Sequence, residues 1–168
     1  MKILAYSITI MFLLLVSGII AFLYGLWFFG KDLPDYKELS KYNPKVVTRI
    51  HAGNGALLAE YAVEKRVFVP INVIPKTVID AFISAEDKDF YKHFGLDLKA
   101  TLRALLTNIK NIGSGKRLIG ASTITQQVAK NFLLSSEVSY ERKIKEAILA
   151  VRIERAFSKN QILELYLN

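Results

Sequence analysis

The hydrophobic pattern divides the chain into one long apolar run and a longer segment in which apolar and polar positions alternate. No charged residue occurs over residues 3–30, where Leu, Ile and Phe dominate. As a helix, this run would be roughly 42 Å long at 1.5 Å per residue, against a hydrocarbon core of about 30 Å. We therefore predict a cytoplasmic tip and a single transmembrane anchor over residues 1–30, in preference to a buried helix of a soluble protein.

A cleaved signal peptide is the stronger alternative for the apolar run. The run is longer than the h-region of a signal peptide, and no clean small-x-small cleavage site follows it. Tyr24, Trp27 and the neighbouring pair Lys31-Asp32 are typical of the interfacial belt at the end of a spanning helix. The charge count leaves the orientation open, because Lys2 favours a cytoplasmic N-terminus and four lysines beyond the run oppose it: Lys31, Lys37, Lys41 and Lys45.

Beyond the anchor, the pattern predicts a polar linker over residues 31–45 and a β-hairpin or extended element over residues 46–73. Asn54-Gly55 lies between two alternating segments and is a strong hairpin signal. The later pattern is helical, and we predict helices over residues 76–86, 98–111, 123–133, 140–157 and 159–168. The loop 111–120 is rich in small and basic residues and is a candidate mobile flap. The predicted fold is mostly α, with one helical domain over residues 74–168.

The charge distribution indicates an anionic partner for the second half of the chain. The formal net charge is +8. Residues 1–97 carry 11 Lys/Arg and 10 Asp/Glu, a difference of +1, whereas residues 98–168 carry 12 and 5, a difference of +7. In an anchored protein, lipid phosphates or an anionic lipid-linked substrate are favoured over nucleic acid as that partner.

The first candidate for chemistry is the acidic pair Glu86-Asp87, followed by His93 and three aromatic residues. A carboxylate at the end of the helix 76–86, beside aromatic side chains, would be partly desolvated, and this suits a general base. The alternative is a solvated acidic turn with His93 packed against aromatic rings.

The second candidate is the helix start that follows Gly120. Thr123-x-x-Gln126 fits a capping box, with Ser122 as an alternative N-cap. Capping leaves Gln127 and Lys130 unexplained. A helix N-terminus with hydroxyls and a lysine nearby also suits a phosphate. The two interpretations are compatible.

The third candidate is Glu146, on a helix that is apolar nearly all round and is therefore expected to be buried. Arg142 and Lys143 precede it by four and three residues, within pairing distance on a helix. The group is either a structural ion pair or a cluster that handles a charged substrate. With His51 and His93 as the two histidines, a His-rich metal site is implausible.

Four motifs in order resemble the peptidoglycan glycosyltransferases of glycosyltransferase family 51. This family comprises the N-terminal module of class A penicillin-binding proteins and the monofunctional transglycosylases. The motifs are Glu86-Asp87-x-x-Phe90-x-x-His93-x-Gly95-x-Asp97, Gly120-x-Ser122-Thr123-Ile124-Thr125-Gln126-Gln127, Arg142-Lys143-x-x-Glu146 and Lys159-x-x-Ile162-Leu163-Glu164-x-Tyr166-Leu167-Asn168.

The resemblance implies a lysozyme-like, mostly α fold on the periplasmic face of the bacterial inner membrane, which would settle the orientation. It implies that lipid II is polymerised into β-1,4-linked glycan with inversion, and that undecaprenyl pyrophosphate is released. The growing lipid-linked glycan and other proteins of cell-wall synthesis are the implied partners. The family continues beyond Asn168, so the resemblance also implies a C-terminally truncated member.

The resemblance assigns roles to eight residues. Glu86 resembles the base that takes the proton from the 4-hydroxyl of the acceptor sugar, and Glu146 the second essential carboxylate, in the donor site. The remaining six resemble cations that contact the pyrophosphate (Lys130, Arg142, Lys143) and residues that line the donor side (Ser122, Thr123, Gln127). The sequence requires no cofactor, although a divalent cation such as Mg²⁺ can assist the pyrophosphate in family members.

Two other functions are weighed against this one. A muramidase-like glycan hydrolase is compatible with the same fold but does not need the cationic cluster. A non-catalytic membrane scaffold of the cell-wall machinery would need neither Glu86 nor Glu146.

Apolar and basic residues over 90–106 predict, in addition, that this segment lies in the membrane interface.

Overall fold

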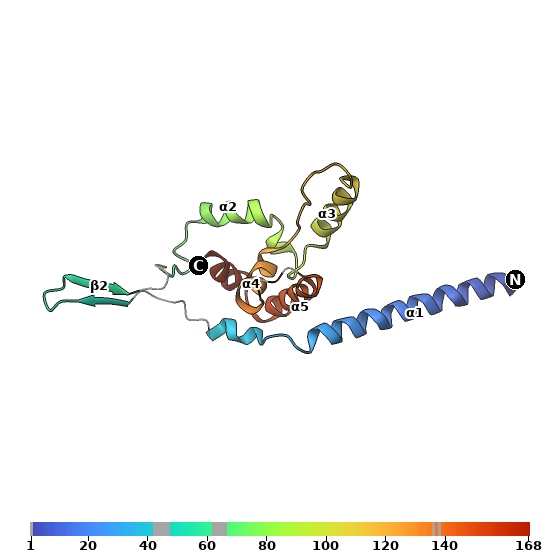
Figure 1. The fold of residues 1–168 in the computed structure, drawn as a ribbon, viewed down its shortest axis with the longest axis horizontal. Helices are drawn as coiled ribbons and strands as arrows, with labels where there is room; N and C mark the ends of the chain where they lie inside the picture. Colours follow the sequence, from blue (N-terminus) through green and yellow to red (C-terminus); the bar gives the residue numbers. More distant parts are fainter. Residues whose placement is uncertain (1, 42–47, 62–66, 136, 138) are drawn as a thin grey trace.

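The computed structural model describes residues 2–41, 48–61, 67–135, 137 and 139–168. It is mostly helical, as the sequence predicts, with one small sheet. Figure 1 shows a helical domain from which the N-terminal helix and the β-hairpin project in opposite directions. The elements, in order, are α1 (Lys2–Gly30), the 3₁₀ helix η1 (Tyr36–Lys41), β1 (Thr48–His51), β2 (Leu57–Tyr61), α2 (Lys76–Glu86), the 3₁₀ helix η2 (Phe90–Lys92), α3 (Leu98–Lys110), α4 (Ile124–Leu133), α5 (Tyr140–Ala156) and α6 (Lys159–Leu167).

Helix α1 has the length and composition of a membrane span. Its segment Tyr6–Gly30 has a mean hydropathy of 2.4, and its most apolar window is not buried against the rest of the protein. Among the described residues, it is the one helix that meets these criteria. The transmembrane prediction is therefore compatible with the structure, in which the apolar side chains of this helix lack a protein core to enter.

The C-terminal end of α1 is attached to the helical domain. The Arg152 guanidinium, on α5, donates a hydrogen bond of 3.2 Å to the carbonyl oxygen of Gly30. Leu39 of η1 is buried in the domain core. The first part of the predicted linker 31–45 is thus packed against the domain, while its residues 42–45 lie outside the described part of the chain.

The predicted hairpin around Asn54-Gly55 is confirmed. Strands β1 and β2 pair antiparallel, with a register irregularity between Ile50 and His51. Gly55 has a φ of +82°, which glycine adopts without steric cost, and the Asn54 side chain accepts a hydrogen bond of 3.0 Å from the backbone N–H of Ala56. Residues 67–70 form no strand, and residues 46–47 and 62–66 of the predicted β element are outside the described residues.

Helix α4 is the centre of the domain core. It contacts both α5 and α6, and five of its ten residues are buried. Phe90 of η2 and apolar residues of α5 and α6 complete the core around it, namely Leu149, Ile153, Ile162 and Leu163. The N-terminus of α4 is therefore held inside the domain.

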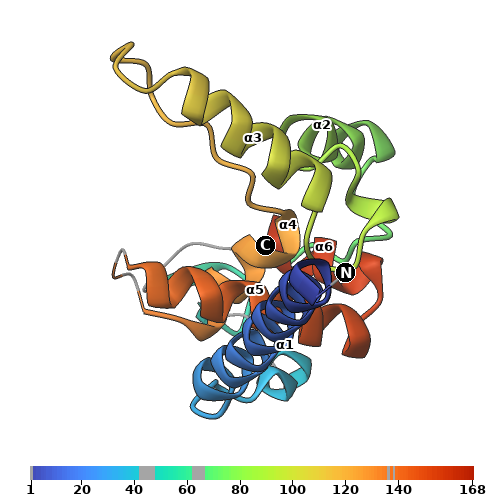
Figure 2. The same cartoon turned by 90° about the vertical axis from the view of Figure 1, so that its right-hand side faces the viewer.

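Helix α3 extends away from this core, together with the loop that follows it (Figure 2). One of its residues, Ala104, is buried, whereas all of its leucines and isoleucines are exposed, namely Leu98, Leu102, Leu105, Leu106 and Ile109. The Asn108 side chain closes the base of the loop, because it donates to the carbonyl of Ile119 at 3.0 Å and accepts from the N–H of Ile119 at 2.8 Å. The outcome is an exposed apolar surface on a projecting arm.

Gly95 lies where η2, α4 and α5 meet. Its φ is +85°, and a Cβ at this position would lie 2.7 Å from the backbone carbonyl of Ala150. Its own carbonyl accepts a hydrogen bond of 2.6 Å from the Thr123 hydroxyl. Both the backbone conformation and the close approach therefore require glycine.

We expect Gly95→Ala to lower the free energy of unfolding by roughly 2–5 kcal/mol, since it combines left-handed strain with overpacking against α5. Gly113→Ala is the matched control: its φ is +81° but nothing lies within 4 Å of its Cβ position, so we expect a loss of only about 1 kcal/mol. Thermal unfolding of the detergent-solubilised proteins, followed by circular dichroism, measures both. Equal losses would contradict the packing role of Gly95.

Candidate active site

The capping box at the start of α4 is confirmed. The Thr123 hydroxyl accepts a hydrogen bond of 3.1 Å from the N–H of Gln126, whose side-chain oxygen accepts one of 3.0 Å from the N–H of Thr123. The N–H of Ile124 donates to Asp87 Oδ2 at 3.1 Å. The expectation that backbone N–H groups of this helix start bind a phosphate is therefore wrong for these groups, because protein oxygens already accept from them.

The buried carboxylate of the first motif belongs to Asp87. Its side chain is 3% exposed, and its two oxygens lie 2.9 and 3.0 Å from Nε2 of His93, which donates to them. Glu86, by contrast, is exposed. The desolvated carboxylate expected in this pair is thus Asp87, since the helix end turns Asp87 inward and leaves Glu86 at the surface.

A second group of buried hydrogen bonds centres on a carboxylate of α5. Glu154 of α5, with a side chain 3% exposed, accepts from the Thr125 hydroxyl at 2.6 Å and from Lys159 Nζ at 2.7 Å. Lys159 also donates to the carbonyl of His93 at 2.8 Å and lies 4.2 Å from the ring centre of Phe90. Sequence reasoning missed this group, and no local spacing joins its members.

Six of the eight predicted site residues line one cavity of about 300 Å³. Glu146 lies at its base with a side chain only 2% exposed. Its carboxylate accepts hydrogen bonds from the guanidinium of Arg142 and from Lys143 Nζ, the latter at 2.7 Å. The lining residues are Ser122, Gln126, Gln127, Lys130, Arg142, Lys143 and Glu146.

The cavity carries more positive than negative charge. Three cations face one carboxylate, and Lys130 is exposed and forms no ion pair with the part of the chain that the structure describes. The other two cations are held in place: Arg142 also donates to the carbonyl of Glu137, and Lys143 donates to the Ser122 hydroxyl at 2.6 Å. Fixed cations in excess suit a ligand with more than one negative charge.

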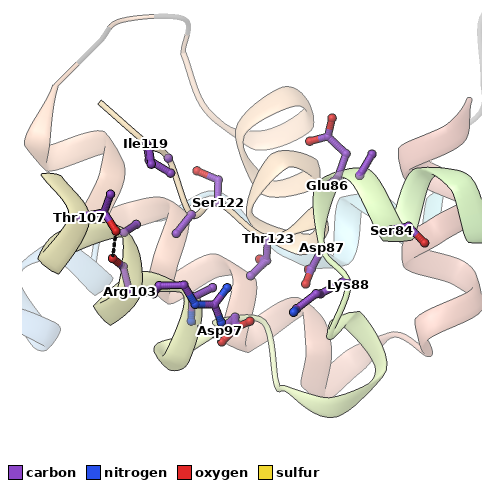
Figure 3. Close-up of a pocket in the computed structure, with 15 residues that line it drawn as sticks. Ser84, Glu86, Asp87, Lys88, Asp97, Arg103, Thr107, Ile119, Ser122 and Thr123 are labelled. Carbon is purple, nitrogen blue, oxygen red and sulfur yellow. Dashed lines mark hydrogen bonds between the residues drawn. The ribbon is translucent and has the colours of Figure 1, made fainter. Parts of the chain in front are cut away.

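The remaining two predicted residues have different environments. Thr123 is 2% exposed, and its hydroxyl is engaged in the cap and with Gly95. Thr123 and Glu86 both line a neighbouring cavity of about 250 Å³ (Figure 3). Oε2 of Glu86 accepts a hydrogen bond of 2.9 Å from Nε2 of Gln127, which lines the cationic cavity. Ser122 lines both cavities, so they adjoin at this residue.

The cavity beside Glu86 contains two cations that sequence reasoning did not select. Lys88 and Arg103 extend from the α2 and α3 sides. The carboxylate of Asp97 in the same cavity caps α3, since it accepts a hydrogen bond of 2.8 Å from the N–H of Ala100. Arg103 lies five residues into α3, where the helical period alone gives no indication of a site.

The family profile described as Transglycosylase matches residues 54–168. The chain belongs to the transglycosylase family. The proteins named Penicillin-binding protein 1A of Rickettsia bellii (strain RML369-C) and Rickettsia conorii (strain ATCC VR-613 / Malish 7) are 53% and 57% identical to it, over 99% and 94% of this chain. That of Aquifex aeolicus (strain VF5) is 42% identical over 100% of it. The chain spans about a fifth of these relatives, 20–22% of their length.

The resemblance inferred from the four motifs is thereby confirmed at the level of the family. The matched region contains both cavities and all eight predicted site residues. Helix α1 precedes the matched region. The roles of individual residues in this transglycosylase stay predictions, which the geometry described above supports to different degrees.

The side chains of the two cavities do not fit a divalent cation held by the protein. No cluster of three His, Asp or Glu side chains occurs in the described ranges. The one carboxylate in the cationic cavity, Glu146, has its oxygens engaged by Arg142 and Lys143.

We expect Asp87→Asn to lower the free energy of unfolding by about 1–3 kcal/mol, because it removes a charged acceptor from buried partners. Glu86→Gln, one residue away and exposed, should change it by no more than about 0.5 kcal/mol. Thermal unfolding of the two variants under identical conditions compares them. A larger loss for Glu86→Gln would contradict the assignment of Asp87 as the structural carboxylate.

Proposed function

We propose that this transglycosylase polymerises lipid II into β-1,4-linked glycan strands in bacterial cell-wall synthesis, with release of undecaprenyl pyrophosphate. One observation carries the proposal: the exposed carboxylate of Glu86 adjoins a cavity with three cations and one buried carboxylate. A sugar transfer from a pyrophosphate donor needs this pairing of a base with positive charge for the leaving group. The name of the relatives, Penicillin-binding protein 1A, supports a cell-wall role.

In the proposed reaction, the donor pyrophosphate lies in the cationic cavity against Lys130, Arg142 and Lys143. The carboxylate of Glu86 takes the proton of the acceptor 4-hydroxyl. The acceptor oxygen then forms a bond to the anomeric carbon of the donor as the bond from that carbon to the pyrophosphate oxygen breaks. Attack from the face opposite the leaving group inverts the configuration and yields the β-linkage. The leaving group departs with its negative charge stabilised by fixed cations.

Glu146 supports the donor site in this scheme. It is buried and holds Arg142 and Lys143 by charge-assisted hydrogen bonds. Ser122 holds Lys143 from the other side. The cations are therefore oriented before the ligand binds, and binding costs little side-chain entropy.

We further propose that α1 anchors the protein in the inner membrane, with the catalytic domain on the periplasmic side. Lipid II and the growing lipid-linked glycan then reach the site from the membrane, where other proteins of cell-wall synthesis are available as partners. The exposed leucines and isoleucines of α3, with basic residues between them, suit the membrane interface. In Figure 1, α3 and the loop after it lie on the side of the domain toward which α1 extends.

The role of Glu86 is tested in the full-length protein with labelled lipid II, by gel separation of the glycan products. Glu86→Gln should lower the rate of polymerisation by at least about 100-fold, because loss of a general base has an effect of this order. Thermal unfolding of the same preparation checks that the variant is folded. Normal polymer from Glu86→Gln would overturn the assignment of the base.

A substitution in the cationic cavity distinguishes a transferase from a hydrolase. We expect Lys130→Ala to lower kcat/KM for lipid II by about 10-fold or more, because a charge-assisted contact to the leaving group is lost. Lys145→Ala is the matched control, since Lys145 pairs at 2.7 Å with the exposed Glu141 on α5 and does not line the cavity. If Lys130→Ala is silent while the protein cleaves soluble glycan, the muramidase-like function holds instead.

A further inference from the structure

We propose that Gln127 is a positioning residue for Glu86: its amide holds the carboxylate in the orientation that removes a proton. The inference rests on the proposed function and makes it more specific. The family resemblance places Gln127 among residues that line the donor side. The geometry instead connects it directly to Glu86, through a hydrogen bond of 2.9 Å from Nε2 to Oε2.

In this hydrogen bond the amide nitrogen of Gln127 donates and a carboxylate oxygen of Glu86 accepts, because the amide nitrogen has protons and no lone pair to offer. Within the described residues, Gln127 is also the side chain that hydrogen-bonds to Glu86. Because Glu86 is exposed, its carboxylate would otherwise rotate among several solvated positions. With Oε2 held, Oε1 is left to accept the proton.

The two residues are brought together by contacts that do not involve either side chain. Glu86 is the last residue of α2, and Gln127 lies in the first turn of α4, 41 positions later. The next residue, Asp87, is bonded to the N–H of Ile124 at the start of α4. The helix ends therefore keep their spacing when the amide is removed, and a substitution of Gln127 changes the side-chain contact alone.

Other charged groups lie near Glu86. Asp87 and Lys88 follow it in the chain, and Lys130 lies one turn beyond Gln127. Asp97, the N-cap of α3, and Arg103 of α3 line the same cavity as Glu86. Tyr166 of α6 lines a groove with Gln127, and burial, followed by the negative charge of Glu86, raises the pKa of its phenol above the usual value. Tyr166 is therefore neutral at physiological pH and does not compete as the base.

The test uses the full-length protein and labelled lipid II, with kcat and KM measured separately. Gln127→Met keeps the length of the side chain but removes the donor. We expect kcat to fall about tenfold while KM for lipid II changes by less than about twofold, because the carboxylate loses its orientation and the cations that bind the donor are unchanged. Combined with Glu86→Gln, the substitution should cause no further loss.

Two further variants keep the test decisive. Gln127→Asn retains the amide but shortens the side chain by one methylene, and we expect the same fall in kcat if Gln127→Met is too unstable to assay. Asn131→Ala is the matched control: it truncates an exposed amide one turn along α4 that forms no hydrogen bond with Glu86 in the described part of the chain, and it should leave kcat and KM unchanged.

The outcomes separate the inference from the function on which it rests. If the unsubstituted protein forms no polymer, the proposed function fails. If it forms polymer and the Gln127 variants raise KM with an unchanged kcat, Gln127 binds the donor and the positioning role is overturned. A further loss in the double variant would overturn it as well.

Discussion

The buried carboxylate of Asp87 is the constraint on which the site depends. It accepts hydrogen bonds from His93 and from the N–H that begins α4, and so joins the end of α2 to the central helix of the core. A carboxylate that is almost completely buried is tolerated only with such partners. Glu86 precedes it by one residue and Gln127 follows Ile124 by three, so the positions of both follow from this one connection.

Two arrangements of charge coexist in the domain. Asp87 and Glu154 are buried acids whose oxygens are satisfied by protein donors, and they hold motifs from distant parts of the chain together. The cavity around Glu146 has cations in excess, and this excess is available to a ligand. Glu146 belongs to both arrangements, because it is buried like a structural acid yet orients the cations of the site.

Helix α5 connects the candidate site to α1. Its first turns carry Arg142, Lys143 and Glu146, and further along Arg152 bonds to the carbonyl at the end of α1. One helix therefore relates the cationic cavity to the apolar helix (Figures 1 and 2). In the proposed function, this connection would set the height of the cavity above the membrane.

The sequence by itself determined the features that depend on neighbours along the chain. The helices follow from apolar periodicity, the cap of α4 from Thr123-x-x-Gln126, and the ion pairs of Glu146 from spacings of three and four residues. Only the tertiary structure decided that Asp87 faces inward and Glu86 outward, and that Gln127 reaches Glu86 across 41 residues. Local period and propensity are short-range effects, whereas these contacts depend on how α2 and α4 pack.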